Sequence, residues 1–315
     1  MKKIFAVIIF ISFLASLSAE ENNHTFYLGA SIGILDGRSE FIVYRSSNSK
    51  DYLSELLWEI KPLTYVGADI RYVWQDESIR WGIFANSSIK FGFSGTTGLM
   101  EDRDWMDDVY QNFLTHYSVH ENSTEDSVLI DINAGVSFKI FDIFLLKPFL
   151  SYSFMRFSWA ASGGSFLYPP DYDPEHAYLI QPIDVITFTQ TWHMLSLGIN
   201  FFSGSNPYFD VEAGIKLSPL VWCSSEDNHI LRDLIISSDL FLALLFEPSL
   251  QFTFKNNDFS RISLIMKYRY ISGLRGDSEY RENGILLSDI PGNIGGTGFS
   301  AFEIGLVFHF LRVMF

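Results

Sequence analysis

Two acidic residues, spaced two apart, are the first feature of the sequence that could do chemistry. Asp102 and Asp104 lie in an acidic run over residues 101–108. In extended backbone, residues i and i+2 point to the same face. Two close carboxylates resist ionising together, so such a pair can share a proton or hold a water molecule. Acidic runs at a loop mouth are more often a solvated rim or a loose cation site, so this pattern alone does not decide.

Two further pairs have the same spacing. Asp227 and His229 would place a carboxylate beside an imidazole, which can fix the tautomer of the ring and raise its basicity, as a general base requires. Ser118 and His120 form the other pair, with no obvious oxyanion hole or third member that would make them a serine-protease dyad. Taken alone, each histidine is more simply an exposed loop residue.

The start of the chain predicts export. Lys2 and Lys3 precede an apolar run that ends in the small residue Ala19, and Glu20 follows. An apolar stretch this short with a small-residue exit is typical of a cleaved signal peptide, predicted here over residues 1–19. An uncleaved anchor is the weaker interpretation, because a bilayer core needs about 20 apolar residues.

The composition favours a membrane protein that crosses with strands. The chain is 48% hydrophobic and 17% aromatic, with 30 Phe and 15 Tyr, yet no segment after the signal peptide has the length of a spanning helix. Lipid cannot satisfy the backbone groups of an open sheet edge, so a membrane protein without helices must be a closed barrel.

The hydrophobic period of the chain after the signal peptide is two, as expected when one face of each strand meets lipid and the other the lumen. Residues 301–310 alternate most clearly, and Phe315 closes the chain as a terminal aromatic. Turn signals divide the chain into ten strands, predicted over 25–46, 51–74, 78–98, 124–141, 146–168, 182–203, 206–224, 233–255, 259–275 and 296–315.

The connections between these strands alternate in length. Short turns follow every second strand, and the intervening connections, 99–123, 169–181, 225–232 and 276–295, are longer and polar. The sequence therefore predicts an all-β, ten-stranded antiparallel transmembrane β-barrel in one domain, residues 20–315, with extended extracellular loops and both termini on the periplasmic side. The acidic pair and the Asp-His pair would then share the outer rim.

The charge of the chain limits its partners. The formal net charge is −15 at pH 7, and removal of Lys2 and Lys3 with the signal peptide makes it −17. Nucleic acid is an unfavourable partner for such a surface, and a cationic ligand or substrate is favoured. The acidity could also serve only to keep the loops soluble. One cysteine, Cys223, excludes an intramolecular disulfide and a cysteine-rich metal site.

Several separate segments together resemble the omptins, endopeptidases of the outer membrane on a ten-stranded barrel. The segments lie in order along nearly the whole chain after the signal peptide. They are Ser31–Gly37, Ser54–Trp58, Asp102–Asp107 (an Asp-x-Asp-Trp-Met-Asp stretch), Ser118–His120, Gly163–Tyr168 and Asp227–His229.

The resemblance implies roles for the three pairs. His229 would be the base that deprotonates a water molecule, and Asp227 would orient it. Asp102 and Asp104 would bind that water and stabilise the tetrahedral intermediate, so no metal or covalent intermediate is needed. Ser118 and His120 are expected to support the site.

The chain departs from the omptin pattern where the family reads basic side chains at the cut. Phe41 stands in place of an acidic residue on the first strand, and Glu40 lies one residue away, on the opposite face unless a bulge intervenes. Ser225 aligns with the second acidic position as well as Glu226 does. Glu226 is the better candidate for substrate binding, and Glu40 the second, but the preference at the cut stays open.

The expected lipid and assembly state also come from the resemblance. Tyr152 and Arg156 match part of a lipopolysaccharide-binding motif, but Phe154 and Thr191 replace its other members. An interfacial aromatic role for Tyr152 and snorkelling of Arg156 explain them equally well. No cofactor is expected beyond such a lipid, and whether activity requires the lipid stays open. The barrel is expected to be a monomer.

Two other functions remain as alternatives to a peptidase. The altered groove and shortened loop before His229 would also suit a non-catalytic omptin-like barrel that acts as a surface adhesin or receptor. A small pore is the weakest alternative, because ten strands leave a narrow lumen that side chains usually fill. Glu303 and His309 are candidates to pair in that lumen.

Overall fold

The computed structural model describes residues 24–45, 52–75, 80–107, 113–141, 143–167, 178–204, 206, 208–255, 261–287 and 294–314. The predicted signal peptide and the terminal Phe315 lie outside these residues. In the described part of the chain, no helix is long and apolar enough to cross a membrane.

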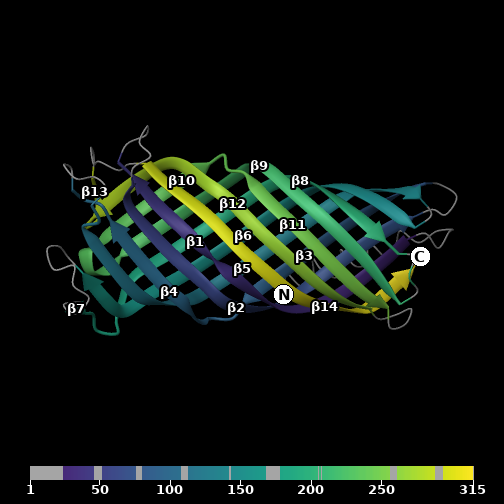
Figure 1. Cartoon of the computed structure of the whole chain (residues 1–315), viewed down its shortest axis with the longest axis horizontal. Coiled ribbons are helices and arrows are strands. Elements are labelled where there is room, and N and C mark those ends of the chain that lie inside the picture. Colours follow the sequence, from purple (N-terminus) through teal and green to yellow (C-terminus); the bar gives the residue numbers. More distant parts are fainter. Residues whose placement is uncertain are drawn as a thin grey trace, which may run out of the picture.

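The described strands form one closed antiparallel sheet (Figure 1). Their bounds are β1 His24–Tyr44, β2 Tyr52–Gln75, β3 Trp81–Gly92, β4 Gly95–Asp104, β5 His116–Phe141, β6 Phe144–Leu167, β7 Tyr178–Leu179, β8 Asp184–Ser203, β9 Phe209–His229, β10 Leu234–Phe241, β11 Leu245–Lys255, β12 Arg261–Glu282, β13 Ile285–Leu287 and β14 Ile294–Met314.

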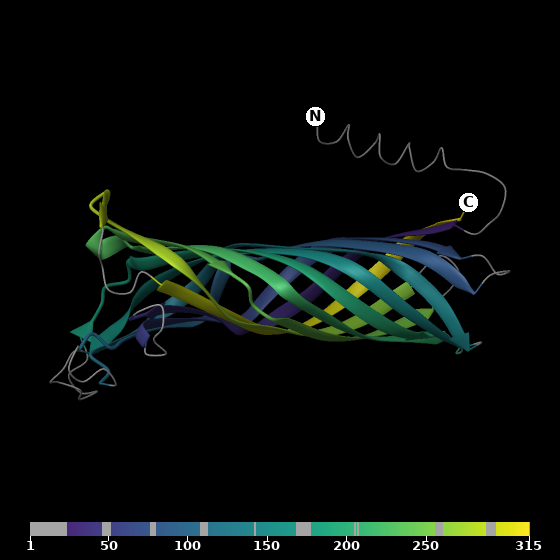
Figure 2. The ribbon, with the colours of Figure 1, turned by 90° about the horizontal axis from the view of Figure 1, so that it is seen from above.

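The predicted ten-stranded barrel is confirmed in this ring of strands. Of the described strands, β3 and β4 together occupy one position of the ring, and β10 and β11 together occupy another. The short strands β7 and β13 pair only with β6 and β12. β1 pairs with β14 and β5 with β6, which closes the cylinder. Thr25 pairs with Met314, so the described ends of the chain lie together, at the end of the barrel away from β7 and β13 (Figure 2).

Two interruptions split a long strand into two. Phe93 and Ser94 separate β3 from β4, opposite the part of β2 that contains Pro62. Residues 242–244 separate β10 from β11, opposite the part of β9 that contains Pro219. Proline has no N–H to donate to a ladder, so a neighbouring strand loses a hydrogen bond and bends there.

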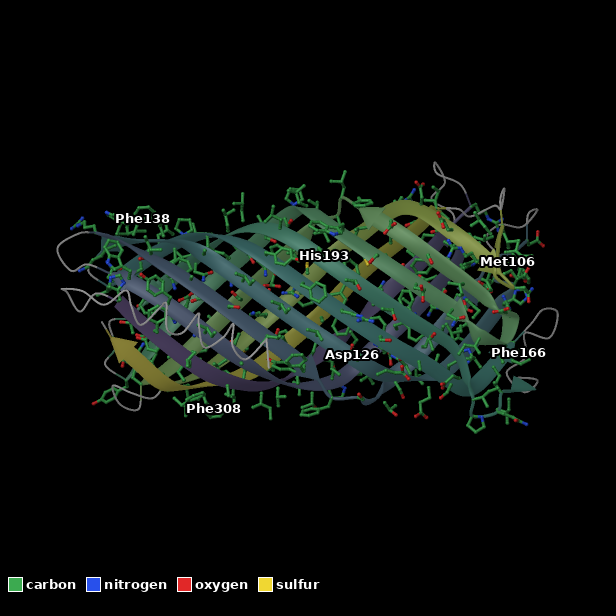
Figure 3. All side chains as sticks on the ribbon, turned by 180° about the vertical axis from the view of Figure 1, so that it is seen from behind. Met106, Asp126, Phe138, Phe166, His193 and Phe308 are labelled. Atoms are coloured by element: carbon green, nitrogen blue, oxygen red, sulfur yellow. The ribbon has the colours of Figure 1, made fainter. Side chains whose placement is uncertain are left out.

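The predicted alternation sets an apolar outer face against a polar lumen in the half of the barrel that holds the described termini. On β14, Phe302, Leu306 and Phe308 face outward and are exposed, while Glu303 and Val307 are buried inside. Figure 3 shows Phe138 and Phe308 on the outer surface, at the end opposite Met106 and Phe166. This apolar belt is the membrane-spanning part of the barrel.

The lumen within the belt is filled by ion pairs. Glu303 accepts hydrogen bonds from Lys90 at 2.5 Å and from Tyr65 at 2.8 Å, rather than pairing with His309 as expected. Lys216 lies 2.9 Å from Glu247, and Arg269 contacts the same carboxylate. A cavity of about 150 Å³ lies beside this network. Elsewhere in the belt the ion pairs fill the lumen, which argues against a pore.

Three predicted loops are wrong, because their described residues are mostly strand. Residues 99–123 contain the ends of β4 and β5, residues 225–232 contain the end of β9, and residues 276–295 contain the end of β12, all of β13 and the start of β14. These strand ends rise beyond the apolar belt, where the outward face meets water instead of lipid. Both faces are then polar, so the period of two in hydrophobicity that marks a strand disappears from the sequence although the ladder continues.

Candidate active site

The acidic pair lies on the lumen face of β4. Asp102 and Asp104 follow Met100, which is fully buried in the barrel, on the same face of the strand. Their backbone is held on both sides, because Asp102 pairs with Leu56 of β2 and with Ser118 of β5. Beyond Asp104, the Trp105 N–H donates to the Leu53 carbonyl at 2.9 Å. The predicted i, i+2 geometry is therefore present on a rigid element.

Burial changes the protonation of this pair. Loss of solvent, and then repulsion from Asp104, raise the pKa of Asp102 to about 7. Burial also raises the pKa of Asp104, against a hydrogen bond from Ser54 and nearby positive groups that lower it. Oδ1 of Asp102 is buried without a hydrogen-bond partner. The pair is thus poised to hold a proton and to bind a polar group.

The Asp-His pair lies on the lumen face of β9, across the mouth of the barrel from β4. Nε2 of His229 lies 3.0 Å from Oδ2 of Asp227. Asp227 is fully buried between its cross-strand neighbours Phe188 and Ile236. Because Nε2 faces the carboxylate, Nδ1 is the ring nitrogen left to take a proton from a reactant.

The electrostatics join the two pairs into one site. Burial lowers the pKa of His229, but Asp227, its hydrogen bond and then Asp102 raise it more, to about 9. His229 in turn lowers the pKa of Asp102, and Arg232, in the 3₁₀ turn after β9, acts on both groups. Oδ1 of Asp227 is also buried without a partner. One cluster of three carboxyls and an imidazole thus surrounds the mouth.

Ser118 and His120 form a hydrogen-bonded chain beside the acidic pair. Nδ1 of His120 lies 2.6 Å from the Gly163 carbonyl, which can only accept, so Nδ1 donates. Nε2 of neutral His120 then accepts from the Ser118 hydroxyl at 2.8 Å. Burial lowers the pKa of His120, which favours the neutral ring. The chain ends on a backbone carbonyl and not on a carboxylate.

Gly163 and Gly164 explain how that carbonyl reaches His120. Both have positive φ, +58° and +90°, which L side chains rarely adopt. A Cβ on Gly164 would lie 1.9 Å from the Val119 carbonyl oxygen. The glycine pair therefore makes a bend in β6 that a Cβ on Gly164 would not allow, and the bend brings the Gly163 carbonyl to His120.

The order of these pairs on a ten-stranded barrel matches a known family. The model of the omptin family matches residues 22–310. The chain belongs to the omptin family. It is an outer-membrane β-barrel, and its site lies at the end that faces the cell surface.

Two known proteins are similar to this omptin. The plasminogen activator of Yersinia pestis is 26% identical over 213 residues, which are 67% of this chain and 64% of the length of that protein. The crystal structure of the outer membrane protease OmpT from Escherichia coli superposes with a TM-score of 0.79 at 17% identity, over 95% of this chain and 100% of that one. The second likeness shows the fold.

The structure contradicts the expectation that Glu226 lines the groove of this omptin. Ser225 and Asp227 are buried on the lumen face, so Glu226 between them points outward and is exposed. It borders a hollow on the outer surface, beside Asp239 and Glu279. Strand alternation decides this placement, since no bulge of β9 lies near Glu226.

Glu40 is on the outer face for the same reason. Phe41 and Ser39 are fully buried in the barrel, and the register of β1 runs unbroken past Glu40. Burial, and then the neighbouring Glu55 carboxyl, raise the pKa of Glu40. No bulge interrupts the pairing of β1 at Glu40, so its side chain stays on the outer face, away from a peptide in the groove.

The two expected lipid-binding residues share the outer face of β6. Tyr152 contacts Nδ1 of His193 through its hydroxyl at 2.8 Å, and His193 stacks on Trp222 with ring centroids 5.0 Å apart. Arg156 is exposed on the same face, next to Thr191 of β8. His193 was not predicted from the sequence, and it joins Tyr152 to the aromatic ring of Trp222 on the outer face.

Proposed function

We propose that this omptin is an endopeptidase at the cell surface that hydrolyses peptide bonds with an activated water molecule. The observation that supports this best is the pair of facing groups, Asp102 with Asp104 on β4 and Asp227 with His229 on β9. Each wall also presents one buried carboxylate oxygen without a partner, on Asp102 and on Asp227. A buried polar atom that lacks a partner keeps hydrogen-bonding capacity that a bound reactant can use.

The proposed reaction begins with His229. Its Nδ1 takes a proton from a water molecule, and the resulting hydroxide oxygen bonds to the carbonyl carbon of the peptide. Asp227 stabilises the imidazolium that forms, 3.0 Å from Nε2. Asp102, whose raised pKa of about 7 lets it carry a proton, donates to the developing oxyanion.

The second half of the reaction returns the proton. His229 gives its proton to the leaving nitrogen, the C–N bond breaks, and the carbonyl of the new carboxyl end re-forms. Asp104 shares a proton with Asp102, so the acidic pair carries less negative charge than two ionised carboxylates. Ser118 and His120 hold the neighbouring strand position of Asp102 and act as positioning residues. No covalent enzyme intermediate is required.

Partners follow from the surface of the barrel. A net charge of −15 for the whole chain would concentrate cationic peptides near the mouth, an effect that salt weakens. Tyr152, His193 and Arg156 on the outer face would contact the headgroup of lipopolysaccharide or a similar lipid. We propose that the barrel acts as a monomer, because one chain contains all four catalytic groups.

Cleavage of a mixed peptide library tests the proposal. The refolded barrel would be compared with His229→Ala and with His193→Ala, which removes a histidine from the outer face instead. We expect products from the wild type and His193→Ala and none from His229→Ala, with each protein assayed with and without lipopolysaccharide. Equal products from wild type and His229→Ala would contradict the mechanism.

A surface adhesin remains the second candidate, favoured by one observation. The described residues at the mouth include exposed apolar side chains on the turn after β9 and on the β12–β13 hairpin, namely Ile230, Leu231, Ile285 and Leu286. Exposed apolar groups in one place are typical of a binding surface. Surface binding that is lost in Leu231→Ser with Leu286→Ser but kept in His229→Ala would favour this function.

A further inference from the structure

A buried tyrosine lies in the same cross-strand row as Asp227. Ile236 of β10 pairs with Asp227 on one side and with Tyr280 of β12 on the other. Tyr280 is buried, while its chain neighbours Glu279 and Arg281 are exposed, so its side chain faces the lumen. Two strand spacings, about 10 Å, separate the backbones of Asp227 and Tyr280. Both side chains point into the narrow lumen of a ten-stranded barrel, so the hydroxyl can reach toward the carboxylate past Ile236.

The strand that holds Tyr280 is tied to the turn after His229. Asn283 and Gly284 have φ of +49° and +75°, as the tight Asn-Gly turn of a β-hairpin requires, and they join β12 to β13. The Asn283 N–H donates to the Asp233 carbonyl at 3.0 Å, and Asp233 ends the 3₁₀ turn after β9. Tyr280 therefore keeps its place relative to the Asp-His pair within one hydrogen-bonded unit.

Asp227 keeps hydrogen-bonding capacity on its second carboxylate oxygen. Oδ2 lies 3.0 Å from Nε2 of His229, and Oδ1 is buried without a partner. The cross-strand neighbours Phe188 and Ile236 are apolar and cannot donate to it. A buried carboxylate is stabilised by each further donor, and a hydrogen bond to an ionised group is about twice as strong as a neutral one. The hydroxyl of Tyr280, next in the row, is a donor that fits this oxygen.

The charged and titratable groups described around the Asp-His pair come from few elements. Asp102 and Asp104 of β4 face it across the mouth, and Arg232 acts on it from the 3₁₀ turn. β12 contributes Tyr280 and, nearer the rim, the exposed Glu282. The cross-strand neighbours of the pair on β8 and β10 are all apolar, namely Ile186, Phe188, Leu234 and Ile236.

The hydroxyl of Tyr280 lies close to the charge of Asp227. Burial, and then Asp227, raise the pKa of Tyr280 above its ordinary value of 10.0. The hydroxyl therefore stays protonated over the range in which His229 titrates, around pH 9, and it can donate throughout. Hydrogen bonds between catalytic groups are often long in a substrate-free enzyme and shorten when substrate binds.

We propose that Tyr280 is a positioning residue of the peptidase site, whose hydroxyl donates to Oδ1 of Asp227 during the reaction. The proposal rests on the proposed peptidase function. The hydrogen bond holds Oδ2 toward the ring of His229 and withdraws part of the charge of the carboxylate. A carboxylate oxygen can accept two hydrogen bonds, so Oδ1 keeps one site for a reactant. Tyr280 thus acts through Asp227 and does not contact the substrate.

A matched pair of variants tests the hydroxyl. Tyr280→Phe removes it and keeps the ring that packs in the lumen, and Tyr270→Phe removes a hydroxyl from the outer face of the same strand. We expect kcat of Tyr280→Phe to fall about tenfold, the loss of one hydrogen bond to a charged group. Tyr270→Phe should cut at the wild-type rate. Wild-type kcat in Tyr280→Phe would overturn the proposal.

The pH profile separates a positioning role from a structural one. Cleavage should fall above the pKa of His229, about 9, because the site then loses the proton that Asp102 must carry. Without the hydroxyl, the full charge of Asp227 acts on His229 and raises its pKa. We therefore expect the falling limb of kcat/KM in Tyr280→Phe to move to higher pH by about 0.5 or more. A limb that stays in place or moves to lower pH would overturn the proposal.

Titration of His229 by NMR separates this proposal from the peptidase function, because it needs no cleavage. If the wild type cuts no peptide, the proposed function fails, but the ring resonances of His229, assigned by their loss in His229→Ala, still report its pKa. We expect this pKa to be higher in Tyr280→Phe than in the wild type. In the Asp227→Asn background, which lacks the charge, Tyr280→Phe should leave it unchanged. An equal pKa in wild type and Tyr280→Phe, or an equal rise in both backgrounds, would overturn the role of Tyr280.

Discussion

Two groups of buried charges in this barrel differ in how they are paired. In the apolar belt, Lys216 lies 3.2 Å from Asp131 and 2.9 Å from Glu247, and Arg269 contacts both carboxylates. At the mouth, Asp227 is as deeply buried and Asp102 is partly buried, yet each keeps one carboxylate oxygen that is buried without a partner. The same residue types fill the lumen in the belt and line the candidate active site at the mouth.

The comparison shows how a structural charge can be told from a catalytic one. Buried ions are tolerated when cations and hydrogen bonds compensate them, and removal of one partner is costly. A carboxyl left uncompensated raises its pKa, as Asp102 does to about 7, and keeps its binding capacity for a reactant. Variants at the mouth should therefore lower activity more than stability, and variants in the belt should lower stability more than activity.

The largest expected effect is on activity at the mouth. His229→Ala removes the base that deprotonates water, so we expect kcat to fall by about 10²–10⁴-fold. The free energy of unfolding should fall as well, because the buried Asp227 loses its partner, so cleavage is compared per folded molecule. Peptide cleavage by the refolded barrel measures kcat, and urea unfolding measures the free energy of unfolding. A His229→Ala variant with wild-type activity would show that the charges at the mouth are not catalytic.

The next largest effect is on stability in the belt. Arg269→Met leaves Asp131 and Glu247 short of a cation, and we expect it to lower the free energy of unfolding by about 3–5 kcal/mol. Cleavage per folded molecule should not change. Asp102→Asn is the matching variant at the mouth. We expect it to lose activity while its free energy of unfolding stays equal or rises. Loss of activity in Arg269→Met and loss of stability in Asp102→Asn would contradict the difference between the two regions.

The pH profile is expected to depend on Asp227. The proposed mechanism needs neutral His229, with a pKa of about 9, and protonated Asp102, with a pKa of about 7. We therefore expect kcat/KM to rise with pH up to about 7, to stay level to about 9 and to fall above that. Asp227→Asn removes the charge that raises the pKa of His229, so the whole profile should move to lower pH. Because the folded-state pKa lies above 6.5, the stabilisation from protonated His229 is complete below pH 6.5 and disappears as the pH passes about 9.

The smallest expected effect is at the hydrogen-bonded serine. Ser118→Ala removes one hydrogen bond to His120, 2.8 Å long, which we expect to cost about 1 kcal/mol or roughly fivefold in rate. The apparent pKa of the His229 limb should stay in place. A loss as large as that of His229→Ala would identify Ser118 as a catalytic residue and would overturn its positioning role.

The sequence was sufficient for the features that depend on local periodicity. Alternation by two gave the lipid face of β14 and the shared face of Asp102 with Asp104, and of Asp227 with His229. Each of these depends only on the backbone of one strand, so no distant contact was needed. Alternation by two also predicted that Glu40 and Phe41 lie on opposite faces of β1, and the structure contains no bulge at Glu40 that would change this.

Above the belt the hydrophobic pattern no longer reports structure. Residues 99–104 and 116–123 belong to β4 and β5, but water on their outer face removes the apolar alternation, so the sequence pattern predicts a loop there. Their strand character comes from hydrogen bonds to β2 and β6, which are distant in sequence. Glu226 was misplaced for the same reason, because its supposed loop is a strand that turns it outward.

The sequence by itself determined the barrel and its orientation, and its resemblance to the omptins supplied the candidate catalytic pairs. Only the tertiary structure decided which side chains meet across the lumen, such as Glu303 with Lys90 and Gln190 with Ser39 and Thr297. Those contacts depend on the register and closure of the whole ring, which no single segment encodes. The Gln190 bridge follows from that closure, because it joins β8 to β1 and β14, the strands at opposite ends of the chain.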